Sequence, residues 1–163
     1  MEATVESVLF AAMLRRAFAL AAVGWASALP LATWIASRPH PLSLPYAAAF
    51  AVYGIGAWVC HQLPDRSFHL WAMQMPVCAR CTGIYAGAAL AAIVWAVAWR
   101  SSAVRRSSVT RWRTALAIAA APTLVTLVVE WAGGGTPPNA VRAIAGVPVG
   151  AAVAWLVLRA EVN

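Results

Sequence analysis

Five long apolar runs constrain the fold of this chain more than any other feature. A helix needs about 20 mainly apolar residues to cross the hydrocarbon core of a bilayer. Helices satisfy their own backbone hydrogen bonds in lipid, and no alternation typical of barrel strands appears. The runs therefore predict an all-α integral membrane bundle of about five transmembrane helices, over residues 17–36, 44–59, 76–99, 114–131 and 139–158.

Composition supports this interpretation and excludes a soluble domain. Of 163 residues, 63% are hydrophobic and 10% are charged, whereas globular chains are nearer 45–50% apolar and about 25% charged. This length suits a single membrane domain over residues 1–163, with the lipid bilayer as its partner. The net charge of +7 comes from arginines near the ends of apolar runs, so it predicts orientation in the membrane and no nucleic-acid partner.

Arginine counting gives an expected topology. With five spans, the regions at 38, 100–113 and 159 share one side of the membrane and hold more arginines than the other side. Cytoplasmic loops carry the excess of positive charge. We therefore expect 100–113 to be a basic cytoplasmic linker, with the N-terminus outside. Arg15 and Arg16 oppose that assignment of the N-terminus.

Small residues recur along the third and fifth runs. Gly83 with Gly87, and Gly146 with Gly150, each form a GxxxG pair, which lets two helix backbones approach closely. We expect these pairs to serve internal packing rather than a dimer face; the oligomeric state stays open.

The segment "VCHQLPDRSFHLWAMQMPVCARCTGIY", residues 59–85, holds all three cysteines and two of the three histidines. We interpret it as a helix–loop–helix motif whose second helix begins near Pro76, a residue suited to a first turn. Cys78 and Cys81 would then share one helix face, and Tyr85 would continue that face. The helix N-terminus and neighbouring Arg80 favour thiolates, which bind metals.

These residues predict a metal site. Cys60, Cys78 and Cys81 with either His61 or His69 form a Cys₃His set, which is typical of tetrahedral zinc. Copper or iron are minority options, since Met73 and Met75 lie nearby. A redox-active CxxC pair and cysteines that only fill space remain alternatives, and three cysteines leave one over in any disulfide framework.

Other ionisable groups are rare and are expected to gather near this segment. Charge in a membrane is costly and faces a bundle interior or a cavity. Glu130 is the candidate general base. The arginines would bind a carboxylate or phosphate, although snorkelling or pairing with Asp65 and Glu130 would also explain them. The expected substrate-binding residues are Gln62, Arg66, Arg80, Tyr85, Asn139 and Arg142.

The chain resembles a family of small bacterial and archaeal membrane proteins known as domain of unknown function 2085. The family pattern is Cys-His-Gln, a proline, Arg-Ser-Phe, and then Pro-x-Cys-x-Arg-Cys-x-Gly-x-Tyr-x-Gly. It matches "CHQLPDRSFHL" and "MPVCARCTGIYAG", and the resemblance extends over about residues 50–158. It implies a location in the bacterial or archaeal inner (cell) membrane and supplies no activity.

The second half of the family pattern is echoed less completely. The matching residues are Pro122, Asn139, Arg142, Gly146 and Gly150. The family's acid falls at Thr126 here, whereas Glu130 stands where the family usually has glutamine. One interpretation is that the acid has moved one helical turn along the same face.

Three functional hypotheses follow. The leading one is an integral membrane metalloprotein with a Cys/His zinc site beside an outer, arginine-lined pocket, which would act on a small anionic or lipid-like substrate. The second is a membrane thiol–disulfide or quinone-linked redox protein that uses Cys78 and Cys81. The third is a carrier of metal or small molecules. A purely structural zinc site is also compatible with the sequence.

Overall fold

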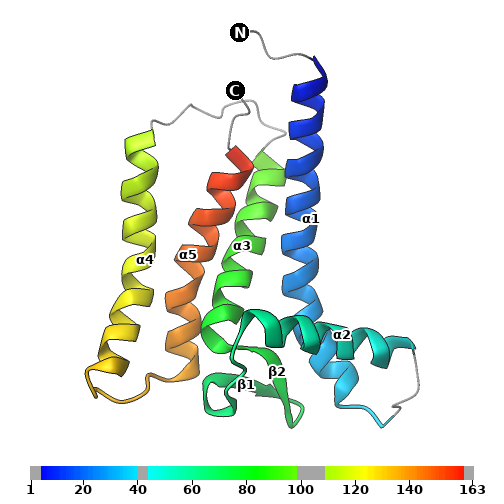
Figure 1. Ribbon diagram of the computed structural model, residues 1–163, viewed down its shortest axis with the longest axis vertical. Coiled ribbons are helices and arrows are strands. Elements are labelled where there is room, and N and C mark those ends of the chain that lie inside the picture. Colours follow the sequence, from blue (N-terminus) through cyan, green and yellow to red (C-terminus); the bar gives the residue numbers. More distant parts are fainter. Residues whose placement is uncertain (1–4, 40–43, 99–108, 160–163) are drawn as a thin grey trace.

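The structure, a computed structural model, describes residues 5–39, 44–98 and 109–159 and confirms an all-α membrane bundle (Figure 1). Most of the described residues are helical, with one small hairpin between the second and third helices. In chain order the elements are α1 Val5–Ala36, α2 Leu44–Val59, a 3₁₀ turn at Pro64–Arg66, β1 Ser67–Leu70, β2 Met73–Cys78, α3 Ala79–Ala98, α4 Val109–Trp131 and α5 Asn139–Arg159.

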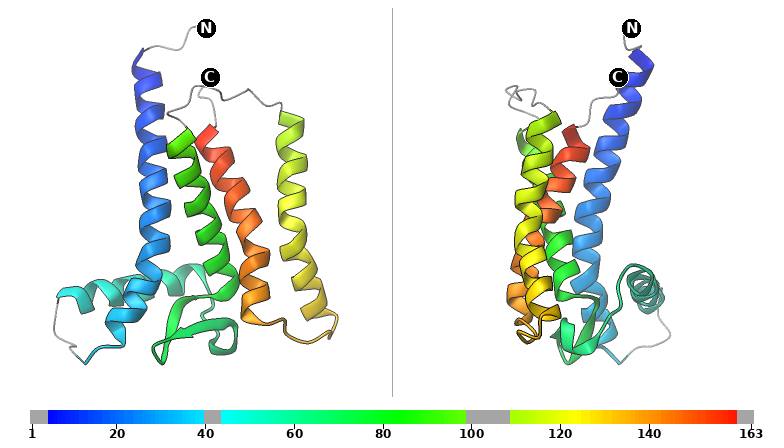
Figure 2. Two further views of the ribbon diagram at one scale, coloured as in Figure 1. Left: turned by 180° about the vertical axis from the view of Figure 1, so that it is seen from behind. Right: turned by 60° about the vertical axis from the view of Figure 1, so that its left-hand side comes forward.

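Four helices among the described residues, rather than five, are long and apolar enough to span a membrane: α1, α3, α4 and α5. The exception is α2, whose 16 residues rise about 24 Å at 1.5 Å per residue, less than a hydrocarbon core of about 30 Å. It lies across the other helices at one end of the bundle (Figure 2). The expectation of five spans is corrected because hydropathy records how apolar a helix is, not how it is oriented.

With four spans, the start of α1 and the end of α5 lie at the same end of the bundle. The start of α1, the end of α3, the start of α4 and the end of α5 lie at one end of the bundle (Figure 1). The hairpin and α2 lie at the other end. The predicted linker falls at residues 100–108, outside the described residues, and at 109–113, which begin α4. An odd number of spans would have separated the start of α1 from the end of α5, so the expectation that these two helix ends lie on opposite sides is corrected.

The centre of the bundle is the contact between α3 and α5. A Cβ added at Gly83 or Gly87 would collide with the backbone of α5, at Ala143 and Val147 respectively. A Cβ at Gly150 would likewise collide with the backbone of α3 at Ile84. The glycine pairs therefore face each other, and the prediction of internal packing is confirmed.

The expected helix–loop–helix motif contains a hairpin instead of a simple loop. Strands β1 and β2 pair antiparallel, with Ser67 opposite Cys78 and His69 opposite Gln74. Pro76 therefore lies within β2, and α3 begins at Ala79 rather than near Pro76. Cys78 ends the strand and Cys81 lies in the first turn of α3, so the two thiols come from different elements.

A small core holds the hairpin against the bundle. Leu29 of α1 packs with Met75 and Val77 of β2, and all three are buried. Tyr85 packs against this core, with its ring edge-on to Trp25 at 6.0 Å between ring centroids. The hairpin is thus anchored by α1 and α3, which fixes the position of the cysteines.

Candidate metal centre

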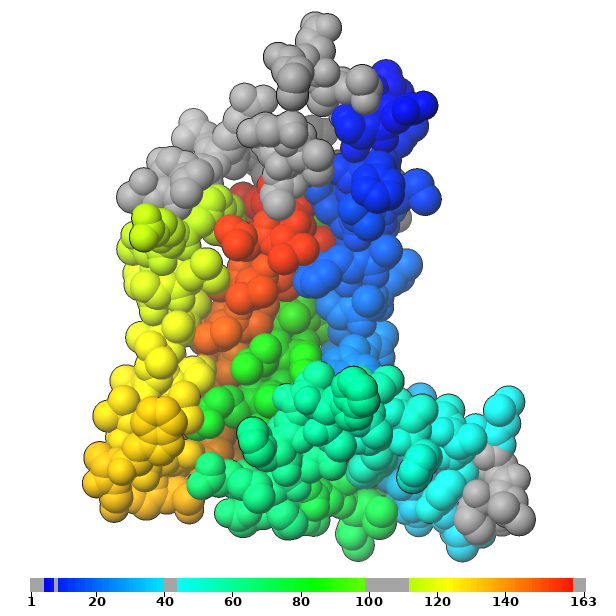
Figure 3. Space-filling view, in the orientation of Figure 1, coloured from blue at the N-terminus to red at the C-terminus, as the bar shows by residue number. Residues whose placement is uncertain are grey.

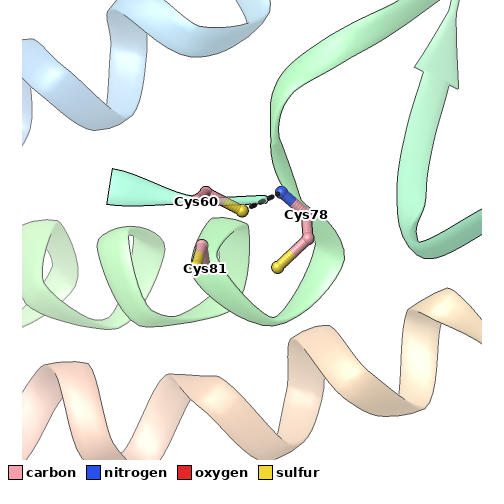
Figure 4. Close-up of side chains that lie close together, drawn as sticks. All are labelled: Cys60, Cys78 and Cys81. Atoms are coloured by element: carbon pink, nitrogen blue, oxygen red, sulfur yellow. Dashed lines mark hydrogen bonds between the residues drawn. The ribbon is translucent and has the colours of Figure 1, made fainter. Parts of the chain in front are cut away.

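The three cysteines converge at the junction of α2, β2 and α3 (Figure 4). Their sulfur atoms lie within 4.8 Å of one another, and all three thiols are free. The backbone N–H of Cys78 donates a hydrogen bond to Sγ of Cys60 at 3.2 Å, which joins the end of α2 to the end of β2. Three sulfurs this close match the ligand geometry of a soft or borderline metal ion.

Gln62 holds the two sides of this junction together. Its backbone adopts a left-handed conformation, with φ of 47°, which is uncommon for a non-glycine residue. Its side-chain amide donates to the backbone oxygens of Tyr53 and Pro76, at 3.0 and 2.5 Å. Gln74 in turn donates to the backbone oxygen of Gln62 at 2.5 Å. These bonds join α2 to β2 and set the distance between Cys60 and Cys78.

The close approach also depends on Gly56. A Cβ at this position would meet the backbone oxygen of Pro76 and the side-chain nitrogen of Gln62. Glycine is therefore required where α2 crosses β2. One turn later, the N–H of Cys60 donates to the oxygen of Gly56 at 2.9 Å and closes the helix.

The surroundings of Cys78 favour its thiolate. A hydrogen bond from the Cys81 thiol, with smaller contributions from Cys60 and nearby backbone, lowers the pKa of Cys78 to about 5, although burial acts in the opposite direction. Because metal ions bind thiolates, this sulfur needs no deprotonation to become a ligand at neutral pH.

The two candidate histidines occupy different positions. His61 is exposed but lines the cavity that the cysteines border. His69 is exposed on β1, away from that cavity. Within the described chain, the group of three sulfurs includes neither histidine. The histidine ligand stays a prediction, with His61 better placed.

A second cluster joins three arginines to one acid. Glu130, only 3% exposed, contacts Nε of Arg142 at 2.9 Å, Nη2 of Arg80 at 3.2 Å and Nη1 of Arg66 at 3.6 Å. Glu130 and the three arginines therefore lie together, as the sequence predicted. Because three guanidinium groups already contact its carboxylate, a role for Glu130 as general base would require one of them to move; this role stays a prediction.

Thr126 and Glu130 both accept hydrogen bonds from Arg80. Nη2 of Arg80 donates to Oγ1 of Thr126 and to Oε1 of Glu130, each at 3.2 Å. The two residues are one turn apart on α4 and share a face. An acid at either position would be within reach of Arg80. That the acid has moved by one helical turn stays a prediction.

The sulfur cluster and the arginine cluster border one cavity of about 360 Å³. Both sets of side chains are therefore available to a single bound molecule. The cavity-lining residues are Val59, Cys60, His61, Gln62, Leu63, Arg66, Cys78, Arg80, Cys81 and Arg142.

Other predicted substrate-binding residues make internal contacts. Asn139 donates from Nδ2 to the backbone oxygen of Ser67 at 3.0 Å and accepts from Nη1 of Arg142 at 3.4 Å. Tyr85 packs in the core described above, and both amide hydrogens of Gln62 have acceptors. Their assignment as substrate contacts stays a prediction, and the contacts seen are those of residues that position the cluster.

Several residues that build the site were not predicted from the sequence. Ser67 donates to the oxygen of Leu63 at 2.9 Å, and Tyr53 donates to the oxygen of Gln74 at 2.5 Å. Gln74 is a polar residue within the apolar stretch "MQMPV", and this isolated polarity was an available signal. Ser67 and Tyr53 carried no comparable signal, because each is common in its setting.

Two relatives share short stretches with this chain. An uncharacterised protein of Methanocaldococcus jannaschii is 40% identical over 47 residues, which cover 29% of this chain and 30% of the relative. An uncharacterised protein of Methanothermobacter thermautotrophicus is 52% identical over 31 residues, covering 19% of this chain and 28% of the relative. The chain thus matches less than a third of the length of either relative. No solved structure matches it.

A family comparison covers far more of the chain. Residues 60–156 match the family described as Predicted membrane protein (DUF2085). This range begins at the first cysteine of the sulfur cluster and continues through Arg80, Glu130 and Arg142 into α5. With more than half of its length matched, and with the membrane bundle that the family description implies, the chain belongs to the DUF2085 family of predicted membrane proteins.

Proposed function

We propose that this protein is a membrane metalloprotein in which Cys60, Cys78 and Cys81 bind one zinc ion beside an anion-binding cavity. The observation that carries the proposal is the mutual distance of the three sulfurs, within 4.8 Å, although they come from three elements. Zinc accepts three thiolates and one further ligand in a tetrahedral site. The part of the chain described supplies three sulfurs, so the fourth ligand is His61 or a molecule in the cavity.

Zinc fits these donors better than the minority options. Iron–sulfur clusters are usually held by four cysteines, whereas this sequence has three. Copper would favour a methionine ligand, but Met75 is buried in the core with Leu29 and Val77. A Met75→Leu variant separates the two metals: a zinc site should keep its metal, and a copper site that uses Met75 should lose it.

The arginines supply the anion-binding half of the proposal. Arg66, Arg80 and Arg142 line the cavity next to the sulfurs. A phosphate or carboxylate held by their guanidinium groups would lie close to the zinc ion. When bound, zinc would act as a Lewis acid that polarises an oxygen of this group. The chain's own contribution is to hold the anion and to exclude competing ligands.

We further place this end of the bundle at the outer face of the cell membrane. The starts of α1 and α4 and the end of α5 lie together at the opposite end of the bundle, and these helices include Arg15, Arg16, Arg113 and Arg159. Cytoplasmic ends carry excess arginine. At the end of the bundle that holds the cysteines, the described arginines are Arg38 and the three that contact Glu130. Only Arg38 is therefore left to influence the orientation. A green fluorescent protein fused to the C-terminus should therefore fluoresce; an active alkaline phosphatase fused there would overturn the orientation.

Elemental analysis of purified protein tests the metal directly. We expect about one zinc ion per chain, and a Cys78→Ser/Cys81→Ser variant should retain less than a tenth of it. Met75→Leu, which changes the neighbouring core but removes no proposed zinc ligand, should keep the zinc ion in the same measurement. If the wild type carries no metal under conditions that preserve its fold, the proposal fails.

A second candidate function is thiol–disulfide exchange. It is favoured by the pKa of Cys78, lowered to about 5 through the Cys81 thiol, because reactive cysteines have depressed pKa values. Oxidation of the two thiols to a disulfide would release two protons and pass two electrons to an acceptor such as a quinone. Reversible loss of thiol labelling upon oxidation, in protein that binds no metal, would favour this function over the first.

A further inference from the structure

The arginine cluster carries more positive charge than its acid can balance. Arg66, Arg80 and Arg142 all contact the single carboxylate of Glu130. Asp65 is 70% exposed and lies 3.9 Å from Arg66, a distance that contributes little at a surface. The three guanidinium groups therefore share one carboxylate, and among the described residues most of their positive charge is not neutralised at close range. Buried charges are usually paired, so the cluster is incomplete as an ion-pair network.

The same arginines have buried donors that make no hydrogen bond. Nε of Arg66, Nε of Arg80 and Nη2 of Arg142 are all without an acceptor in the described part of the chain. The side chain of Arg142 is 3% exposed, so bulk water does not readily satisfy it. A buried donor without an acceptor is costly. Since these side chains line the cavity, an oxyanion there would supply the missing acceptors.

Helix α2 indicates where such an anion comes from. It has no charged residue, yet its apolar side chains point outward: Phe50 is 76% and Trp58 is 94% exposed. Figure 3 shows α2 uncovered across the front of the bundle. A helix that is apolar on all sides is stable when buried in protein or lipid, not in water. We conclude that α2 lies within the lipid at the membrane boundary.

The cavity lies beside the end of this apolar helix. Val59 and Cys60, at the end of α2, form part of its lining. We infer that the cavity binds the phosphate headgroup of a membrane lipid, whose acyl chains stay outside against α2. The inference deepens the proposed function: it names the class of anion and depends on the arginine-lined cavity, not on the metal.

Size and chemistry agree with a headgroup. The cavity of about 360 Å³ is near the lower end of the range of about 300–1,000 Å³ for small-molecule sites. It therefore has room for a phosphate group and its glycerol, not for two acyl chains. Arginine binds phosphate with paired N–H donors, which matches the unsatisfied nitrogens of this cluster.

The test is a lipid-binding titration of the full-length protein in detergent, followed by native mass spectrometry. Three probes are compared: dioleoyl phosphatidic acid, dioleoylglycerol with the same chains and no phosphate, and inorganic phosphate alone. We expect phosphatidic acid to bind at least tenfold more tightly than either other probe. Arg66→Gln should weaken its binding roughly tenfold, as expected for loss of a charged hydrogen bond.

Arg38→Gln is the matched control, because Arg38 stacks on Trp34 near the same membrane face and lies outside the cavity lining. It should change phosphatidic acid binding less than twofold. Arg66 is 40% exposed, so its substitution should leave the fold intact, as thermal unfolding of the same samples will check.

Each other outcome overturns part of the inference. Equal affinity for inorganic phosphate would reject a lipid source and retain only a phosphate site. Equal affinity for dioleoylglycerol, or equal effects of the Arg66 and Arg38 variants, would reject the phosphate site itself. Metal content measured on the same samples separates these failures from failure of the proposed zinc centre.

Discussion

The sulfur cluster and the arginine cluster border one cavity but are assembled in different ways. The three cysteines lie in one short segment, residues 60–81, and converge through a hairpin and the hydrogen bonds of Gln62. The arginine cluster joins the 3₁₀ turn before the hairpin to α3, α4 and α5 through Glu130. The sulfur cluster therefore depends on local geometry, whereas the arginine cluster depends on how distant helices pack.

This difference makes the two clusters separable by experiment. Damage to the local segment should remove the metal while the helices stay packed. Damage to helix packing or to Glu130 should disturb the arginines while the three sulfurs keep their geometry. Each prediction below tests that separation, beginning with the largest expected effect.

Removal of the metal should have the largest effect. Structural zinc contributes about 10–16 kcal/mol of apparent binding free energy in small zinc domains. After chelation, hydrogen exchange should increase across residues 60–78 while the α3–α5 contact stays protected. Thermal unfolding and exchange mass spectrometry measure both. Uniform loss of protection throughout the bundle would show that the two regions are not independent.

Glu130→Gln should produce the next largest effect. It leaves Arg66, Arg80 and Arg142 without their shared carboxylate, and breaking a buried ion pair costs roughly 3–5 kcal/mol. Unfolding in detergent should show the loss of stability, whereas the metal content should stay unchanged. The control is Glu6→Gln, because Glu6 is exposed in the first turn of α1. Loss of metal in Glu130→Gln would contradict the separation.

Gly83→Ala should destabilise the helix packing by a smaller amount. The new Cβ would collide with the backbone of Ala143, and such overpacking costs about 1–3 kcal/mol. Gly24→Ala is the matched control, since a Cβ there meets no atom within 4 Å, and helix propensity then favours alanine by about 0.5–1 kcal/mol. Opposite shifts in unfolding midpoint are expected. Equal shifts would show that the glycine contact is unimportant.

The pKa of Cys78 predicts the smallest effect. In metal-free protein its pKa of about 5, against an ordinary value of 9.0, raises the thiolate fraction at pH 6 by roughly a thousandfold. Lower intrinsic nucleophilicity offsets about a hundredfold of this, which leaves roughly tenfold faster alkylation. Peptide mapping after iodoacetamide treatment at pH 5–9 should show a plateau for Cys78 above about pH 6.

Cys81→Ala provides the corresponding control. It removes the thiol that donates to Cys78, so the pKa of Cys78 should rise and the plateau should move to higher pH. A Cys78 reaction rate that climbs steadily to pH 9 in the unmodified chain would contradict the predicted thiolate.

Sequence predicted the parts of this molecule that short-range patterns determine. Helix α2 has the predicted bounds of 44–59, and α5 begins at Asn139 as expected, because apolar runs and their flanking residues mark helix ends. The three cysteines were grouped correctly, since few residues separate them. The facing glycines were assigned to internal packing from their spacing alone.

Sequence analysis failed where tertiary context decides. The hairpin was missed because β1 has four residues and sits between two strong helices. The orientation of α2 could not follow from hydropathy, which made it resemble a span. The left-handed Gln62 gave no local signal, since glycine or asparagine usually occupies such positions. Pairing of Arg66 and Arg80 with Glu130 was one of the sequence alternatives and is confirmed, whereas the contact of Arg142 with the same acid depends on how α4 and α5 pack.

X-ray absorption at the zinc edge of the purified protein tests the central claim most directly, because it counts the sulfur atoms around the metal. We predict three sulfur ligands at about 2.3 Å and one nitrogen or oxygen ligand at about 2.0–2.1 Å. Fewer sulfur ligands in the Cys60→Ser variant would confirm that the end of α2 takes part. A spectrum with only nitrogen and oxygen ligands, or a well-folded protein without metal, would contradict the account.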